Sequence, residues 1–254
     1  MEEIYIFGHK NPDTDTILSA LILEAIEKTM GIYKTKAYRL GEVNKETQYA
    51  LDYFGVKAPE LLEEVEEGRQ VMLVDHNEFG QSVKGIEKAK IIRVVDHHKI
   101  ANFETKEPLF YMAMPVGCTA TILRDMCKVS GIKLDRITAG LMLSAIISDT
   151  LLLKSPTTTE KDKETAEELA KIANVDLNAY GMDMLKAGTD LSDFTPEQLI
   201  NIDSKPFCTK GVKYQVAQVN TASIDNVMKD KEKIEEAMAK YNSDPKPQKQ
   251  EQNT

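Results

Sequence analysis

The sequence predicts an α/β fold: a mostly parallel sheet flanked by helices, followed by a second, smaller and incomplete α/β domain. Three β-prone runs, at residues 4–7, 70–74 and 91–95, each lead into acidic and histidine side chains. Helical or loop segments of crossover length separate these runs, which is typical of βαβ units with helices on both faces of the sheet. We therefore expect the polar side chains to meet at the carboxyl edge of the sheet, where α/β proteins bind ligands.

The first half of the chain is predicted to alternate between strands and helices. Its first helix follows a polar loop at residues 8–16, with Asp15 or Thr14 as the expected cap and apolar residues at helical spacing behind it. Gly55 stands where the end of the second helix is expected, after a helix at about residues 45–54. The strands are predicted at residues 4–7, 36–40, 70–74 and 91–95.

From about residue 116 the chain is predicted to become helical and then to enter a partial second domain. Thr159 and Asp162 resemble a capping box at the start of one helix. The helices are predicted at residues 117–129, 136–147, 160–173, 176–186 and 223–241, and the later strands at 199–202, 207–209 and 214–219. The predicted organisation is a first domain at 1–187, a linker at 188–195, a short second domain at 196–241 and a disordered polar tail at 242–254.

Composition narrows the class of protein. A formal net charge of −9 argues against a broad basic surface for nucleic-acid backbones. The three cysteines, Cys118, Cys127 and Cys208, form no paired metal-ligand spacing and no disulfide framework, so reduced thiols in a cytoplasmic protein are expected. We see no secretory signal, and no apolar run approaches the ~20 residues that a membrane span needs.

The polar residues that follow the strands, together with one acid after a later helix, have the chemistry of a metal centre. Oxygen and imidazole ligands without thiolates suit Mn²⁺, Mg²⁺, Co²⁺ or Zn²⁺. Carboxylates that share a site raise one another's pKa, and two divalent ions would balance four negative charges. Two such ions can activate water for phosphoryl transfer. The candidate ligands are His9, Asp13, Asp15, Asp75, His97, His98 and Asp149.

Each of these residues has a less specific interpretation when it is taken alone. An aspartate after a strand is more often a helix cap or turn residue, and a single histidine is more often structural. Neighbouring residues on an extended strand point to opposite faces, so His97 and His98 are expected to have different roles. His76 is interpreted as an indirect contributor or a surface residue. The metal hypothesis depends on three strand ends carrying such residues together.

Five motifs resemble the manganese-dependent, family II inorganic pyrophosphatases of the DHH phosphoesterase superfamily. The resemblance covers residues 1 to about 240 and implies hydrolysis of pyrophosphate to two orthophosphates through a hydroxide that bridges two metals. The motifs are Gly-His-Lys-Asn-Pro-Asp-Thr-Asp (8–15), Val-Asp-His-Asn-Glu (74–78), Asp-His-His (96–98), Pro-Val-Gly-Cys-Thr-Ala-Thr (115–121) and Ser-Asp-Thr-Leu-Leu-Leu-Lys-Ser-Pro-Thr (148–157).

The resemblance also implies roles for single residues. His9 and Asp13 would bind one Mn²⁺ (or Co²⁺), Asp15, His97 and Asp149 would bind a second, and Asp75 would bridge the two. His98 would contact substrate and donate a proton, Lys205 would bind a phosphate, and Asp96 would orient a metal-bound histidine. Additional Mg²⁺ would arrive with the pyrophosphate. Residues 1–187 would form the metal-binding catalytic domain, and residues 196–241 would form a partial substrate-clamping domain. A cytoplasmic homodimer, with no nucleic-acid or membrane partner, is expected.

The sequence departs from the family pattern near its end. Family members continue to a Ser-Arg-Lys-Lys-Gln motif that binds substrate, and this sequence has no such motif after Tyr241. Losing one charge-stabilising contact typically lowers a rate by about 10²–10³, so metal binding with impaired turnover is the expectation. The alternatives are a short-chain polyphosphate or nucleotide phosphatase of the same superfamily, or a catalytically inactive truncated product.

Overall fold

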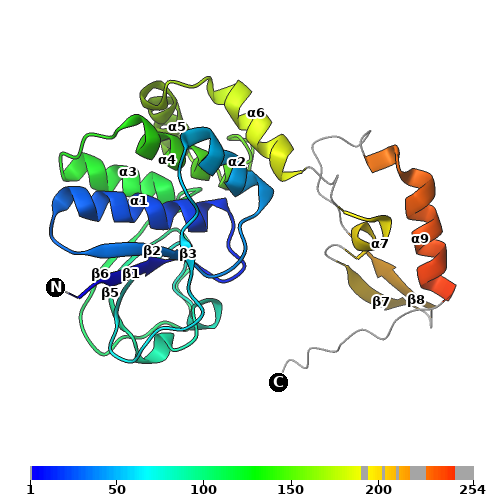
Figure 1. The fold of residues 1–254 in the computed structure, drawn as a ribbon, viewed down its shortest axis with the longest axis horizontal. Helices are drawn as coiled ribbons and strands as arrows, with labels where there is room; N and C mark the ends of the chain where they lie inside the picture. The colour runs from blue at the N-terminus through cyan, green and yellow to red at the C-terminus, as the bar shows by residue number, and fades with distance from the viewer. Residues whose placement is uncertain (1, 190–193, 202–203, 210–211, 218–226, 244–254) are drawn as a thin grey trace. The chain divides into compact units, whose positions relative to one another are not determined.

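The computed structural model describes residues 2–189, 194–201, 204–209, 212–217 and 227–243 (Figure 1). The chain divides into two compact units, Met1–Gly188 and Thr189–Thr254, and each is described by itself. Within these described ranges, no helix is both long enough and apolar enough to cross a membrane.

The first unit contains a six-stranded sheet with the order β3-β2-β1-β4-β5-β6, and every neighbouring pair is parallel. The chain builds outward from β1 in one direction, then returns to the middle and builds outward from β4 in the other. The order therefore reverses between β1 and β4, and α/β proteins bind ligands at such a reversal, beyond the carboxyl ends of the strands. The strands are β1 (Ile4–Phe7), β2 (Thr35–Arg39), β3 (Glu60–Leu61), β4 (Gln70–Val74), β5 (Lys90–Asp96) and β6 (Phe110–Ala113).

The predicted parallel sheet is confirmed, and the four strands predicted for it are present. Two strands were not predicted, the two-residue β3 and the edge strand β6. β3 is too short to show any alternation of apolar and polar residues. Residues of β4 alternate between two cores, with Met72 and Val74 in one and Val71 and Leu73 in the other, so both faces of the sheet are covered.

The expectation of helices on both faces is wrong for the first unit. Figure 1 shows its α-helices on one side of the sheet, and the core on the other side contains no residue of an α-helix. Loops and the 3₁₀ turns η1 (Phe79–Gln81) and η2 (Ile86–Lys88) cover that second face. The helices are α1 (Thr14–Met30), α2 (Lys45–Phe54), α3 (Thr119–Val129), α4 (Arg136–Asp149), α5 (Glu160–Ala173) and α6 (Leu177–Gly188).

Helix α4 runs through the middle of the helical layer. It packs against α1 and α5, and residues 139–147 are all buried, because a helix that is apolar all round is enclosed by its neighbours. Gly140 permits this packing, since a Cβ at that position would lie 2.2 Å from ring atoms of Phe54. The metal-ligand candidate Asp149 ends this helix and is thereby attached to a largely buried element of the unit.

The second unit contains an antiparallel pair, β7 (Lys205–Thr209) and β8 (Val212–Val216), with helices α7 (Pro196–Leu199) and α9 (Lys231–Ser243). The strand predicted at 199–202 is wrong for its described residues, 199–201. Residue 199 is the last residue of α7, and residues 200 and 201 form a turn. Thr195 and Gln198 form a capping box with Pro196 at the first turn, and these local helix signals outweigh the β-propensity of the apolar residues. Of the predicted tail, residues 244–254 lie outside the described part.

Candidate metal centre

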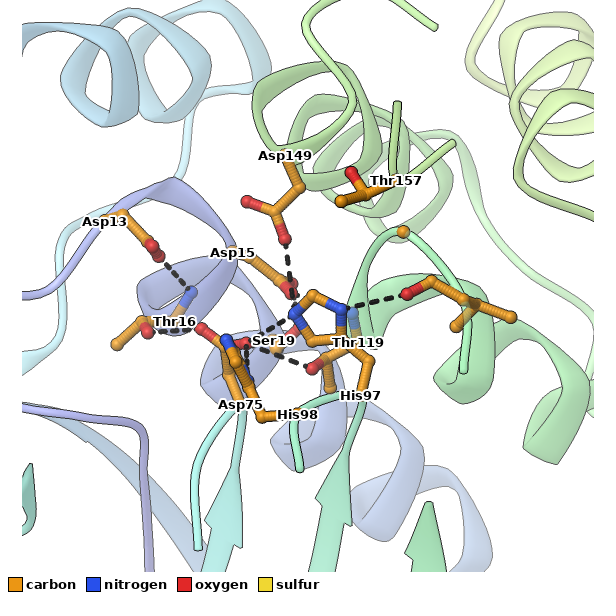
Figure 2. A network of polar contacts seen from close by, with 12 residues as sticks. Asp13, Asp15, Thr16, Ser19, Asp75, His97, His98, Thr119, Asp149 and Thr157 are labelled. Carbon is orange, nitrogen blue, oxygen red and sulfur yellow. Dashed lines mark hydrogen bonds and ion pairs between the residues drawn. The ribbon is translucent and has the colours of Figure 1, made fainter. Parts of the chain in front are cut away.

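The carboxyl ends of β1, β4 and β5 bring the predicted metal ligands together where the strand order reverses (Figure 2). Six of the seven candidates supply nitrogen or oxygen atoms to two overlapping groups, within each of which all ligand atoms lie within 4.8 Å of one another. A third group contains the seventh candidate, His98, with two of the six. The first two groups are His9, Asp13 and Asp75, and Asp15, Asp75, His97 and Asp149.

The first group is built on the loop between β1 and α1. Asp13 is the N-cap of α1 and accepts a hydrogen bond from the Thr16 N–H at 3.0 Å, so the expected cap, Asp15 or Thr14, is wrong by one or two residues. His9 Nδ1 donates to the Lys10 carbonyl at 2.7 Å. Because Nδ1 is occupied, Nε2 faces the site, 3.5 Å from Asp13 Oδ2 and 3.4 Å from Asp75 Oδ2.

The second group draws its four residues from different parts of the chain. Asp15 lies inside the first turn of α1, where it is fully buried and accepts hydrogen bonds from Ser19 Oγ at 2.6 Å and the Thr119 N–H at 2.7 Å. His97 Nδ1 donates to the Val116 carbonyl at 3.0 Å. Its Nε2 therefore points inward, toward Asp149 of α4 (Figure 2), and the distance from His97 Nε2 to Asp149 Oδ2 is 3.7 Å.

Asp75 lies at the centre and belongs to every group. Its φ of +58° is a left-handed conformation that non-glycine residues rarely adopt, and such conformations concentrate at functional sites. The two carboxylate oxygens face different histidines, with Oδ2 toward His9 and Oδ1 3.3 Å from His97 Nε2. Thr16 and Thr119 donate their hydroxyls to Oδ2 and Oδ1 at 2.5 and 3.2 Å. This arrangement suits a carboxylate shared by two cations.

Two carboxyl groups of the centre have pKa values above the usual range of aspartate. Burial, reinforced by the charge of Asp75, raises the pKa of Asp15 to about 6. Burial and the neighbouring carboxylates raise the pKa of Asp149 well above its usual value, and the negative end of the α4 dipole acts in the same direction. Both carboxylates are therefore harder to ionise than an exposed aspartate, and nearby positive charge would favour their ionised forms.

The pKa values of His9 and His97 are also raised, which favours the charged form of these side chains. Burial lowers the pKa of His9, but hydrogen bonds to Asp13 and Asp75 outweigh it and raise the pKa to about 11. The pKa of His97 rises to about 9, because its hydrogen bond to Asp75 and the charge of Asp15 outweigh burial. Protons on these imidazoles supply the positive charge that divalent cations would supply. Four carboxylates and two inward-facing imidazoles fit Mn²⁺ or a similar borderline ion.

His98 lies beside this cluster in a more open position, with 51% of its side chain exposed. Asp96 Oδ1 accepts from His98 Nδ1 at 2.9 Å and from the His98 N–H at 3.0 Å, so the predicted partner of a metal-facing histidine instead orients His98. The expected opposite orientation of His97 and His98 is also wrong: their ring centroids are 4.2 Å apart. β5 ends at Asp96, so strand alternation no longer applies to these two residues.

Several residues of the site were missed by the sequence analysis. Thr16, Ser19 and Thr119 hold carboxylates, and Asn77 Nδ2 donates to Asp96 Oδ2 at 2.7 Å and to the Lys99 carbonyl at 2.9 Å. Thr119 belongs to a quoted motif (115–121), and Asn77 belongs to another (74–78). Ser19, four residues after Asp15 on the same helix, is the residue for which helical spacing could have given a signal.

The sequence analysis also named His76 and Lys205. His76 is 3% exposed, so its interpretation as a surface residue is wrong. Its Nδ1 donates to the Val74 carbonyl at 2.9 Å and its Nε2 accepts from Ser82 at 3.1 Å, and burial lowers its pKa, which makes it a neutral structural residue. Lys205 begins β7 in the second unit, and its side chain lies outside the described part.

Comparison with known proteins gives consistent matches. The DHH family N-terminal domain matches residues 3–146, and the DHHA2 domain matches residues 182–246. A probable manganese-dependent inorganic pyrophosphatase of Oceanobacillus iheyensis is 56% identical over 238 residues, covering 94% of this chain and 77% of the relative. The manganese-dependent inorganic pyrophosphatase of Bacillus subtilis is 54% identical over 241 residues, covering 94% of this chain and 78% of the relative.

Solved structures agree with these matches. The crystal structure of a putative family II inorganic pyrophosphatase from Methanococcus jannaschii is 40% identical, has a TM-score of 0.74, and is matched over 95% of this chain and 80% of its own. An exopolyphosphatase-related protein from Bacteroides fragilis, 14% identical with a TM-score of 0.58, covers 81% of this chain and 62% of its own and shares the fold alone.

Proposed function

The chain belongs to the family of manganese-dependent inorganic pyrophosphatases, and from this membership we propose that it hydrolyses inorganic pyrophosphate to two orthophosphates at the centre formed by β1, β4 and β5. The observation that carries the proposal is the position of Asp75, whose two oxygens each face a histidine of a different ligand group. A small polyanion is a suitable substrate for such a centre, because phosphoryl transfer requires charge neutralisation and positioning.

Two Mn²⁺ ions are assigned to the two ligand groups. His9 and Asp13 would hold one ion, Asp15, His97 and Asp149 the other, and Asp75 would contact both. When bound, such ions supply positive charge for phosphate oxygens and make water more acidic near neutral pH. The hydroxyls of Thr16 and Thr119 hold Asp75 in its left-handed conformation, so the shared carboxylate is oriented before any ligand arrives.

His98 is assigned to the substrate. Hydrolysis adds water across the P–O–P bridge, and the departing phosphate takes up a proton that His98 can provide. Asp96 occupies His98 Nδ1 and raises the pKa of that imidazole, which leaves Nε2 on a half-exposed ring as the nitrogen that faces a ligand. Asn77 donates a hydrogen bond to the other oxygen of Asp96. Asn77, Asp96 and His98 therefore form a hydrogen-bonded chain, in which His98 is the residue assigned to the substrate.

Other features of the proposal rest on the family resemblance. Lys205 is assigned to a substrate phosphate, Mg²⁺ accompanies the pyrophosphate, and the chain acts as a homodimer without a nucleic-acid or membrane partner. A cytoplasmic location is supported by Cys118 and Cys127, which are free thiols buried in the core.

The test compares substrates and metals on the purified chain. After removal of metal with EDTA and reloading with Mn²⁺, phosphate release is measured from pyrophosphate, tripolyphosphate and ADP. We expect pyrophosphate to be hydrolysed fastest, with activity lost in EDTA and in Asp75→Asn but kept in Asp52→Asn, an exposed carboxylate on α2. Faster release from tripolyphosphate or ADP would instead favour a short-chain polyphosphate or nucleotide phosphatase.

A further inference from the structure

We infer that Glu46 is a positioning residue, an inference that rests on the proposed function: its carboxylate holds together two helix ends that carry ligands of both metal ions. Glu46 lies in the first turn of α2 and is not itself near enough to join a ligand group. Its Oε1 accepts hydrogen bonds from Thr14 Oγ1 at 2.7 Å and from Ser148 Oγ.

The two donors are placed beside the ligands in the chain. Thr14 lies between Asp13 and Asp15 at the start of α1, and Ser148 immediately precedes Asp149 at the end of α4. Glu46 Oε1 therefore connects the start of α1, which carries one ligand of each metal, to the end of α4, which carries Asp149. A shift of either helix end would change the separation of the carboxylates, because each ligand is covalently adjacent to a donor.

The surroundings of Glu46 keep its carboxylate in place. Thr14 is fully buried, and its hydroxyl also contacts Thr47 Oγ1 at 3.0 Å, so the hydroxyl that donates to Glu46 is itself held in place. On the other side, a Cβ at Gly188 would lie 2.8 Å from Glu46 Cβ and 3.0 Å from its Oε2. The last residue of α6 thus packs directly against the side chain, and only glycine permits this approach.

Charge alone does not explain a carboxylate at this point. The neighbouring ligand cluster is already rich in acids, and a further negative charge there is unfavourable unless something compensates it. The N-terminal turn of α2 provides part of that compensation, because the positive end of a helix dipole favours carboxylates. The two hydroxyl donors provide the rest, and they make Glu46 the acceptor on which both helix ends converge.

The experiment measures Mn²⁺ binding to the full chain by the EPR signal of free Mn²⁺, with Glu46→Ala, Glu46→Gln and Gln48→Ala compared. Gln48 is an exposed residue of the same helix and serves as the matched control. Glu46→Ala should weaken Mn²⁺ binding about 10–100-fold, the usual effect of losing a partner that orients metal ligands. Glu46→Gln keeps an acceptor oxygen and should retain most of the affinity, as Gln48→Ala should retain all of it.

A second variant covers the case in which Glu46→Ala does not fold, as judged by circular dichroism without metal. Ser148→Ala removes one hydrogen-bond donor to Glu46. It should weaken the binding of the Mn²⁺ ion held by Asp149, while the other Mn²⁺ ion still binds. Wild-type affinity in Glu46→Ala, or in Ser148→Ala, overturns the role of Glu46. A wild-type chain that binds no Mn²⁺ at all overturns the proposed metal centre as well, so the two failures are distinguishable.

Discussion

Binding of Mn²⁺ to the metal-free chain should release protons, and the number follows from the site. At pH 7.5 His97, with a pKa of about 9, and His9, with a pKa of about 11, both carry a proton that must leave before the imidazole nitrogen can bind a metal. Burial and the neighbouring carboxylates also raise the pKa of Asp149 above its usual value, which can only add to the release. Asp15, with a pKa of about 6, is already largely ionised. The expected release is about two to three protons per chain.

Isothermal titration calorimetry measures this release. Mn²⁺ is titrated into EDTA-treated, dialysed protein in three buffers of different ionisation enthalpy at pH 7.5, and the slope of the observed enthalpy against the buffer enthalpy equals the number of protons. His9→Gln should lower the slope by about one proton, because its side chain does not titrate. Asp52→Asn, the exposed control on α2, should leave the slope unchanged. A slope near zero in the wild-type chain would refute the charge balance described for the cluster.

The same protons govern the stability of the metal-free chain. Folding raises the pKa of both histidines above the unfolded value of 6.5, so their protonation stabilises the folded state fully below that pH. This contribution is lost as the pH rises through about 9 for His97 and about 11 for His9. Thermal unfolding in EDTA should therefore give a lower Tm at pH 9 than at pH 6.5. Saturating Mn²⁺ should reduce that difference, because the metal replaces the protons.

Three further outcomes test other parts of the molecule. His98→Gln should lower kcat for pyrophosphate by about 10²–10⁴, the usual contribution of a general acid, while Mn²⁺ affinity in the EPR titration stays unchanged. Asn77→Asp, which replaces the donor to Asp96 with an acceptor, should lower kcat by about tenfold or more; unchanged kinetics would exclude Asn77 from the line of residues that orients His98. Gly140→Ala should destabilise the fold by about 1–3 kcal/mol in urea unfolding, because its Cβ would overlap the Phe54 ring. A more stable variant would show that helix propensity outweighs this overlap.

Local sequence patterns account for the parallel sheet and for the convergence of the ligands. The β-prone runs that became β1, β4 and β5 end at the predicted polar residues, and parallel strands necessarily bring such ends to one edge. His9, Asp13, Asp75 and His97 were found for this reason. Patterns failed where an element was very short, as in β3, or where helix capping outweighed β-propensity, as in α7.

By itself, the sequence determined which residues can form the metal centre, because strand ends and helix starts are local signals. Only the tertiary structure decided how those residues are held. Asp96 accepts a hydrogen bond from His98, and Thr119 donates hydrogen bonds to Asp15 and Asp75. Glu46 accepts hydrogen bonds from both Thr14 and Ser148. Most of these partners lie far apart in the chain, so the local periodicity of the sequence could not predict their contacts. Their pairing depends on how α1, α3 and α4 pack over the sheet, which is a property of the assembled core.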